Sequence, residues 1–292
     1  MIKSILPTSF NNRKAEYMIK NEVISRAIDY ILTHIGEPIH VDEIAAYCHF
    51  SKHHLSRLFK AETGEGIYEF VKRLKIEQSA FRLKVEPDRS ITKISGSYGY
   101  SSSNYSTAFK QHYDVSPVHF RRTILERSRT NPIFNNTLPD WESFADCQRK
   151  ITIEQLPDYY VVYDRHKGSY KSLSEHWCEF LEKHKTYRTE ETLLMECTYD
   201  DPVITDTDSC LYDLYMTVPE EAPLSPTCYL KGGKFAIYHF KGMVDQIYHG
   251  IQSLYNVWLP QSGHFLDERY GFEIYRKVDG DYMEIDICTP IK

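Results

Sequence analysis

Apolar positions follow helical spacing through the first part of the chain. The three-and-four period predicts an amphipathic helix over residues 24–35, which a glycine and a proline end. We expect a short helix over residues 41–48, a tight turn at residues 49–50, and a second helix for which Ser51 is a good N-cap. A longer helix over residues 67–84 follows. This order indicates a helix-turn-helix with a connecting helix behind it.

The same helical unit occurs twice along the chain. Sliding the sequence against itself superposes residues of similar character at one constant offset: Ile44, Phe50, Leu55, Phe59, Lys60 and Phe70 fall on Ile94, Tyr100, Tyr105, Phe109, Lys110 and Phe120. In the second copy we expect Ser90 to cap the first helix, and Ser101 or Ser102 to begin the second. Two equivalent helices suit a periodic polymer such as DNA, so nucleic acid is the first partner to consider.

The second helix of each unit has a polar face opposite its apolar face. Arg57 is the strongest candidate for reading sequence, because its planar guanidinium can bond guanine O6 and N7 together, worth about 1–3 kcal/mol of discrimination. The candidates for base contacts are His53, Ser56, Arg57, Ser103, Ser106 and Thr107. The candidates for contacts with the DNA backbone are Lys52, Lys60, Lys110, Arg121 and Arg122. The alternative is that these residues are only the solvated face of amphipathic helices.

The two halves of the chain carry opposite charge. Residues 1–130 contain 20 Lys and Arg against 14 Asp and Glu, a formal charge of +6. Residues 131–292 contain 15 against 27, a formal charge of −12. A basic surface attracts phosphates and an acidic one repels them, so the charge assigns any DNA contact to the first half.

Two segments resemble the AraC/XylS family of transcription regulators. They read FSKHHLSRLFK over residues 50–60 and FKQHYDVSPVHFR over residues 109–121, and the resemblance covers about residues 24–122. It implies two recognition helices that enter successive major grooves on one face of the DNA, and RNA polymerase as a further partner. Thr107 stands where an arginine is common in the family, and the second motif reads one residue shorter than the usual turn.

Strand patterns replace helical ones in the second half. Residues 126–148 hold prolines and asparagines with little periodicity, and we interpret them as a linker with local order around Trp141 and Phe144. Five runs rich in β-branched and aromatic residues then predict strands, at residues 159–163, 211–218, 235–240, 272–276 and 282–289. Helices are expected near residues 171–183 and 244–258. This pattern is typical of an α+β domain.

The second half contains a fainter repeat of its own. Val161, Val162, Tyr163, His166, Lys167 and Gly168 fall on Phe235, Ala236, Ile237, Phe240, Lys241 and Gly242 at one constant offset. We therefore predict a multidomain chain: a tail (1–20), an all-α double helix-turn-helix domain (21–125), a linker (126–148), and an α+β domain of two pseudo-symmetric strand-helix-strand-strand modules (149–292). The junction of two such modules leaves a crevice, which is a usual place for a ligand.

Residues 149–292 resemble a GyrI-like effector-binding domain. The resemblance rests on the segments RHKGSY (165–170), KGGKF (231–235), WLPQSG (258–263) and ICTPI (287–291). An N-terminal AraC-type domain followed by a C-terminal GyrI-like domain is the arrangement of Rob-type regulators. Met243, Val244 and Asp245 replace the Pro-Tyr-Glu usual in the family, which predicts a different shape for the second half of the site.

Glu273 is the main candidate for effector binding. It lies in an apolar strand, and the resemblance implies that it faces the centre of an aromatic pocket, with Asp286 as a second acid and Cys288 where a tyrosine is common. A desolvated carboxylate among aromatic rings is costly alone, and a lipophilic cation relieves that cost. The candidates for the pocket wall are Tyr163, Tyr170, Trp177, Tyr215 and Trp258. Glu196, followed by Tyr199, is a candidate partner from the other module.

Each of these assignments has a plainer alternative. Because side chains alternate along an antiparallel strand, Glu273 can equally point into water, and aromatic residues at such spacings belong to the core more often than to a pocket wall.

The leading hypothesis is a regulator whose basic half binds a promoter and whose acidic half binds a small molecule. A second hypothesis is a hydrolase, in which a pocket glutamate near a tyrosine acts as a base or nucleophile. We expect no enzyme, because the sequence holds no Ser-His-Asp order, metal cluster or phosphate loop. A third hypothesis is that the second half only docks another protein.

The cysteines indicate the compartment. All seven are scattered singly without a Cys-x-x-Cys pair, so we expect no zinc and no other cofactor. An odd number of cysteines without a signal peptide fits a reducing cytoplasm. No apolar run approaches the roughly 18 residues of a membrane span, so a cytoplasmic protein is expected.

Overall fold

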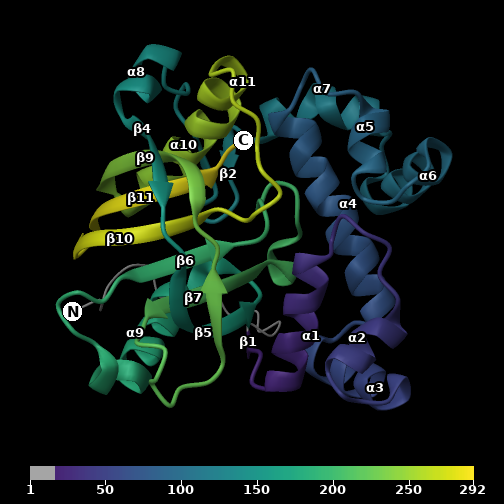
Figure 1. Cartoon of the computed structure of the whole chain (residues 1–292). Helices are drawn as coiled ribbons and strands as arrows, with labels where there is room; N and C mark the ends of the chain where they lie inside the picture. The colour runs from purple at the N-terminus through teal and green to yellow at the C-terminus, as the bar shows by residue number, and fades with distance from the viewer. Residues whose placement is uncertain (1–16) are drawn as a thin grey trace. The chain divides into compact units, whose positions relative to one another are not determined.

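The computed structural model describes residues 17–292, and it divides into two units (Figure 1). One unit is helical and spans Ile19–Arg127. The other comprises Ser128–Lys292 together with strand β1 (Tyr17–Met18), which pairs with it. Residues 1–16, most of the expected tail, lie outside the described residues. Among the described residues, no helix is both long enough and apolar enough to cross a bilayer.

The helical unit contains the predicted repeat. Its helices are α1 (Glu22–Thr33), α2 (Val41–Tyr47), α3 (Lys52–Thr63), α4 (Ile67–Val85), α5 (Ile91–Gly96), α6 (Ser102–Tyr113) and α7 (Pro117–Arg127). The first residues of α2, α3 and α4 correspond to the first residues of α5, α6 and α7 at the same offset that relates the two copies in the sequence. The double helix-turn-helix is therefore confirmed.

Local chemistry repeats together with the helices. Ser51 Oγ accepts from a backbone N–H at the start of α3, and Ser101 Oγ does the same for α6, both at 3.4 Å. These bonds satisfy N–H groups that have no partner within the helix. The turn before each cap contains a residue in the left-handed region, His49 in the first copy and Gly99 in the second.

The buried rings of the two copies correspond as well. Phe59 and Phe70 meet edge to face at 5.2 Å between ring centroids, and Phe109 and Phe120 meet in the same way at the same distance. All four rings are fully buried. Each copy therefore has its own small core, in which the second helix of the motif packs on the helix that follows it.

A chain of ionisable side chains joins α4 to both helix-turn-helix motifs. Arg73 of α4 bonds Glu65, in the turn after α3, and Glu77 of its own helix, both at 2.8 Å. Glu77 is buried and also lies 3.2 Å from His112 of α6. This network connects the surroundings of α3 and α6 through one continuous helix.

The second unit is built on an antiparallel sheet. Within the described residues it has nine strands in the order β1-β5-β7-β6-β10-β11-β9-β4, with β8 also paired to β5. The strands are β4 (Ile151–Leu156), β5 (Tyr159–Lys167), β6 (Leu194–Thr198), β7 (Leu211–Thr217), β8 (Thr227–Leu230), β9 (Gly233–Met243), β10 (Phe272–Asp279) and β11 (Tyr282–Pro290). The predicted α+β class is confirmed.

Two modules of the predicted kind meet in the middle of this sheet. The first runs β5, η1 (Tyr170–Ser172), α9 (Leu173–His184), β6 and β7. The second runs β9, η4 (Val244–Gln246), α10 (Ile247–Ser253), the π-helical turn η5 (Leu254–Trp258), β10 and β11. The orders β5-β7-β6 and β10-β11-β9 mirror each other, so the modules join where β6 pairs with β10.

Both module helices cover the same face of the sheet. Trp177 of α9 bonds Glu196 of β6. Gly250 of α10 lies so close to β9 that an added Cβ would meet the rings of Tyr238 and Phe240 at 3.3 Å. We call this side the helix face, and the other side the opposite face.

The segment interpreted as a linker is largely folded onto the second unit. It contains the hairpin of β2 (Thr130–Asn131) and β3 (Asn136–Thr137), and it ends in α8 (Phe144–Arg149). Glu142 accepts from the hydroxyl of Tyr238 at 2.7 Å, and its backbone N–H donates to Ser253. The residues that make these polar contacts follow no regular spacing in the sequence. The spacing of apolar residues therefore does not predict that this segment packs on the second unit.

Candidate DNA-binding surface and effector site

The exposed face of α3 contains the residues proposed to contact DNA. His53, Arg57 and Lys60 are exposed, and Ser56 is half-buried between them and the core. Lys52 is exposed too, but its ammonium pairs with Asp42 at 2.8 Å. Contact with a phosphate would require Lys52 to exchange that partner, and exposed pairs of this kind are weak.

The exposed face of α6 is equivalent and carries less charge. Ser103, Ser106, Thr107 and Lys110 are all exposed and correspond to His53, Ser56, Arg57 and Lys60 of α3. The hydroxyls of Ser106 and Thr107 donate to backbone carbonyls one turn earlier, at 3.0 and 3.2 Å. Both hydroxyl hydrogens are thus engaged inside the helix, and the oxygens keep lone pairs for a donor.

Arg121 and Arg122 of α7 differ in their surroundings although they are adjacent. Arg122 is exposed. Arg121 is only half-exposed, and its guanidinium donates to the carbonyl of Arg89 at 2.8 Å, while burial lowers its pKa. Arg121 therefore ties α7 to the chain before α5, and the phosphate contact expected for it is not supported by its position.

On the helix face, directly paired residues form one row across five strands. Leu214 pairs with Glu196, Glu196 with Glu273, Glu273 with Ile287, and Ile287 with Tyr238. Paired residues of an antiparallel sheet point to the same side. The two carboxylates therefore lie side by side at the junction of the modules, with apolar neighbours beyond them.

Glu196 is the more enclosed of the two acids. It is 3% exposed, and one of its carboxylate oxygens accepts from the indole of Trp177 at 3.2 Å and from the hydroxyl of Tyr275 at 2.7 Å. Burial raises the pKa of Glu196, and the two hydrogen bonds act in the opposite direction. The donors come from α9 and β10, so Glu196 connects the two modules.

Glu273 has different surroundings. Its side chain is half-buried, and no hydrogen bond or ion pair to it is found among the described residues. Burial raises its pKa, and the neighbouring carboxylate of Glu196 raises it further. A carboxylate of this kind can pair with a positively charged group that a ligand supplies.

Aromatic rings surround the two acids on the helix face. Trp177 and Tyr275 pack edge to face with 5.2 Å between ring centroids. Tyr170 of η1 is buried, burial raises its pKa, and its hydroxyl finds no partner among the described residues. Of the five aromatic residues predicted to line a pocket, Tyr170 and Trp177 lie on the helix face.

Three of the predicted effector residues lie on the opposite face. Tyr163 and Tyr215 are buried there, 5.9 Å apart, and the hydroxyl of Tyr215 donates to Asp213. Asp286 pairs with Ile274 in register and bonds His239 at 2.7 Å and Arg276 at 2.6 Å. The register thus separates these three from Glu273.

Trp258 belongs to the packing of η5 on α8. It is 1% exposed, and its indole N–H donates to Gln148 at 2.9 Å. This bond holds the linker segment on the second unit, so Trp258 has a structural role and no exposed surface for a ligand.

Two aromatic residues near the acids were not among the predicted site residues. Tyr275 lies two positions after Glu273, so strand alternation was a sufficient signal for placing it on the same face. Tyr255 of η5 accepts from the hydroxyl of Thr289 at 3.1 Å and approaches Gly271, also two positions from Glu273. No sequence pattern indicated Tyr255.

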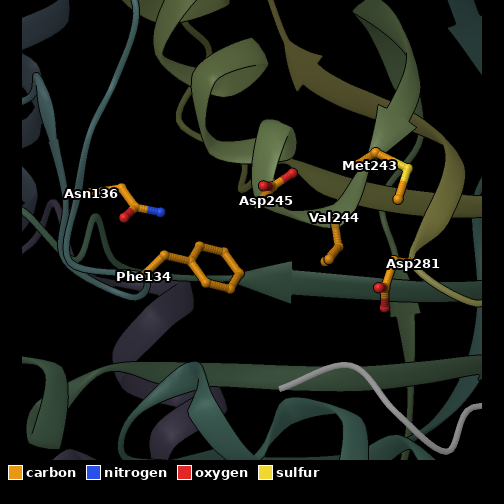
Figure 2. A pocket seen from close by; sticks show the side chains of 6 residues that line it. All are labelled: Phe134, Asn136, Met243, Val244, Asp245 and Asp281. Atoms are coloured by element: carbon orange, nitrogen blue, oxygen red, sulfur yellow. The ribbon is translucent and has the colours of Figure 1, made fainter. Parts of the chain in front are cut away.

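A separate cleft lies at the start of the second module helix (Figure 2). It has a volume of about 300 Å³, and the ring of Phe134 from the β2–β3 hairpin faces η4 across it. Its lining residues are Phe134, Asn136, Met243, Val244, Asp245 and Asp281. Met243, Val244 and Asp245 were expected to change the shape of the effector site. They line this cleft instead, and Glu273 is not among its lining residues.

Comparison with known proteins identifies both units. Residues 44–123 match a family model described as a helix-turn-helix domain. Residues 149–292 match a model described as a GyrI-like small molecule binding domain. The probable transcription factor PqrA of Proteus vulgaris is 33% identical over 114 residues, which are 39% of this chain and 83% of that protein. The chain belongs to the AraC/XylS family of transcription regulators.

Two further proteins are similar to part of this AraC/XylS-family chain. The multiple antibiotic resistance protein MarA of Escherichia coli is 30% identical over 104 residues, covering 35% of this chain and 81% of that protein. The crystal structure of the EcmrR C-terminal domain matches 49% of this chain and 96% of that chain, at 13% identity and a TM-score of 0.41. The predicted arrangement, an AraC-type helix-turn-helix domain followed by a GyrI-like domain, is confirmed.

Proposed function

We propose that this regulator is cytoplasmic, binds DNA sequence-specifically through α3 and α6, and binds a small apolar cation at Glu273. The observation that carries the effector assignment is the surroundings of Glu273. It is a half-buried carboxylate beside a second acid and among aromatic rings, with no cationic partner among the described residues. A lipophilic cation supplies the missing charge and the cation–π contacts together.

On the DNA, we propose unequal roles for the two recognition helices. Arg57 reads a guanine, and His53 and Ser56 lie beside it on α3. The neutral hydroxyls of Ser103, Ser106 and Thr107 make weaker contacts from α6. Exposed cations supply phosphate contacts, and these are Lys52, Lys60, Lys110 and Arg122. RNA polymerase is the partner that the family implies for such a regulator.

No observation favours the hydrolase alternative. A general base at neutral pH must be ionised, whereas burial and Glu196 both favour the protonated form of Glu273. We therefore propose that the effector leaves the protein unchanged. We expect a bound cation to be recovered unaltered after long incubation with the full chain. Release of a hydrolysis product would support the hydrolase hypothesis instead.

The test uses the full-length protein and tetraphenylphosphonium, a permanent apolar cation. We expect saturable binding that weakens at least tenfold in Glu273→Gln and persists in Asp286→Asn, which alters an acid on the opposite face. DNA binding is measured in parallel by selection from a pool of random duplexes. Equal binding by wild type and Glu273→Gln would overturn the effector site, and a pool without enriched sequence would overturn specific DNA binding.

A further inference from the structure

We infer that Glu196 and Glu273 share one proton in the ligand-free protein, and that an effector cation replaces this proton, so that binding releases it to the solvent. The inference rests on the proposed function of Glu273 as the effector site. It adds that the site is a proton-exchanging pair rather than a preformed negative charge.

The two acids occupy neighbouring positions at the junction of the modules. Glu196 and Glu273 are directly paired across β6 and β10, on the helix face. Opposed residues of an antiparallel pair have Cβ atoms about 4.5–5.5 Å apart. Two carboxylates held this close in a water-poor setting do not both ionise readily, and one of them retains a proton.

The hydrogen bonds of the two acids decide which of them holds the proton. Glu196 accepts two hydrogen bonds, from Trp177 and Tyr275, and acceptor bonds stabilise the charged form of a carboxylate. Glu273 accepts none among the described residues. The proton therefore resides mainly on Glu273, although the titration steps belong to the pair.

The groups facing the pair supply no compensating positive charge. Tyr275 of β10 and Tyr170 of η1 have pKa values raised by burial, so both are neutral near pH 7. On β11, Ile287 opposes Glu273, and the pKa of Cys288, on the opposite face, is also raised. Tyr255 of η5 is bonded to Thr289.

No ion pair to Glu196 or Glu273 is found among the described residues, and cations of neighbouring elements have other acidic partners. Lys183 of α9 pairs with Asp164 at 2.6 Å, and Arg276 pairs with Asp286, also at 2.6 Å, on the opposite face. Among the described residues, the charge that can displace the proton must therefore come with the ligand.

This assignment specifies the class of effector. A permanent cation, such as a quaternary ammonium or phosphonium with apolar substituents, keeps its charge at every pH. Its affinity should rise about tenfold per pH unit until Glu273 ionises by itself, and then level off. A neutral molecule of the same shape cannot displace the proton and should bind far more weakly.

The first experiment measures proton release during binding. Tetraphenylphosphonium is titrated calorimetrically into the full-length protein at pH 6.5, in buffers of different ionisation enthalpy. We expect close to one proton released per cation bound, and a smaller release in Glu196→Gln, where the like charge beside Glu273 is removed while its burial remains. Triphenylphosphine oxide is the neutral control. Tight binding with the same dissociation constant from pH 5.5 to 8.5 and no proton released would overturn the inference.

The second experiment separates the inference from the proposed function. The carboxyl carbons of glutamates are followed by ¹³C NMR in the ligand-free, full-length protein, and the signal of Glu273 is assigned from its absence in Glu273→Gln. We expect it to titrate well above the usual glutamate value of about 4.3, and to move down in Glu196→Gln. Titration in the usual range would overturn proton sharing even if cations bind. A raised titration without cation binding would retain the shared proton and reject only the effector.

Discussion

His49 and Gly99 occupy equivalent turns of the two helix-turn-helix motifs, and both have a left-handed backbone, with φ of 61° and 78°. Glycine adopts this conformation freely, whereas a residue with a Cβ is strained in it. We therefore expect His49→Gly to raise the free energy of unfolding by about 0.5–1 kcal/mol, measured by urea denaturation.

Gly99→Ala is the matched control for that substitution. An added Cβ would have an ordinary contact with Lys75, at 3.8 Å, so its cost comes from the backbone alone. We expect a loss of about 1 kcal/mol. A destabilised His49→Gly would show that the imidazole contributes more than the strain costs.

Arg57 and Lys110 test the unequal roles of the recognition helices. Arg57→Ala should remove preference at one base pair, costing about 1–3 kcal/mol for the cognate duplex and little for others. Lys110→Ala should weaken binding to all duplexes and lower the slope of log affinity against log salt by about 1. Binding to a cognate and a scrambled duplex, at several salt concentrations, distinguishes these outcomes. The assignment fails if both variants retain the wild-type affinities.

Adjacent arginines of α7 give a second matched pair. Arg122→Ala should reduce DNA affinity without changing stability, because this side chain is exposed. Arg121→Ala should instead lower the free energy of unfolding by about 1–2 kcal/mol, since it removes a charged donor from the carbonyl of Arg89. A loss of DNA affinity in Arg121→Ala at unchanged stability would reverse this assignment.

The helical unit could be predicted almost completely from the sequence. Its signals are local: caps such as Ser51, apolar periods, and a repeat whose offset also fixes the starts of α5, α6 and α7. The exception is Arg121, whose partner is the backbone carbonyl of Arg89, in the segment before α5. A bond to a distant carbonyl has no sequence signature.

The effector site could be predicted only in part, because strand register decides it. The repeat indicated Glu196 as a candidate partner from the other module, but it did not show that Glu196 and Glu273 are directly paired across β6 and β10. The same register places Tyr163 and Tyr215 on the opposite face. A shift of one residue in the pairing would move every side chain of the strand to the other face of the sheet. Pairing between distant strands depends on the whole sheet, so spacing along the chain does not specify it.

Trp177 should report occupancy of the effector site. Its ring packs on Tyr275 and its indole N–H bonds Glu196, so a cation near the acids must alter its emission. We expect tetraphenylphosphonium to quench tryptophan fluorescence in the wild type, and this quenching to disappear in Trp177→Phe. Trp258→Phe is the control, because Trp258 packs on α8. Quenching that survives Trp177→Phe but not Trp258→Phe would place the ligand elsewhere.

The raised pKa of Glu273 predicts how stability depends on pH. Its pKa in the folded state lies above the unfolded value of about 4.3, so the protonated form contributes stability that is fully present at low pH. That contribution is lost as pH rises through the folded pKa, because ionisation then places a charge in a buried position, and beside the carboxylate of Glu196. Between pH 6 and 9 we expect the wild type to lose on the order of 2 kcal/mol more than Glu273→Gln, since burial raises the pKa of Glu273 to about 8 and each pH unit below that value corresponds to about 1.4 kcal/mol.

Urea denaturation of both proteins across this pH range measures the difference. Glu196→Gln should show part of the protection seen in Glu273→Gln, because it removes the like charge while burial still raises the pKa of Glu273. Asp286→Asn should not show it, since its carboxylate lies on the opposite face and already pairs with Arg276 and His239. Parallel pH profiles for the wild type and both glutamine variants would mean that Glu273 and Glu196 ionise independently, and the close pairing across β6 and β10 would then have no electrostatic consequence.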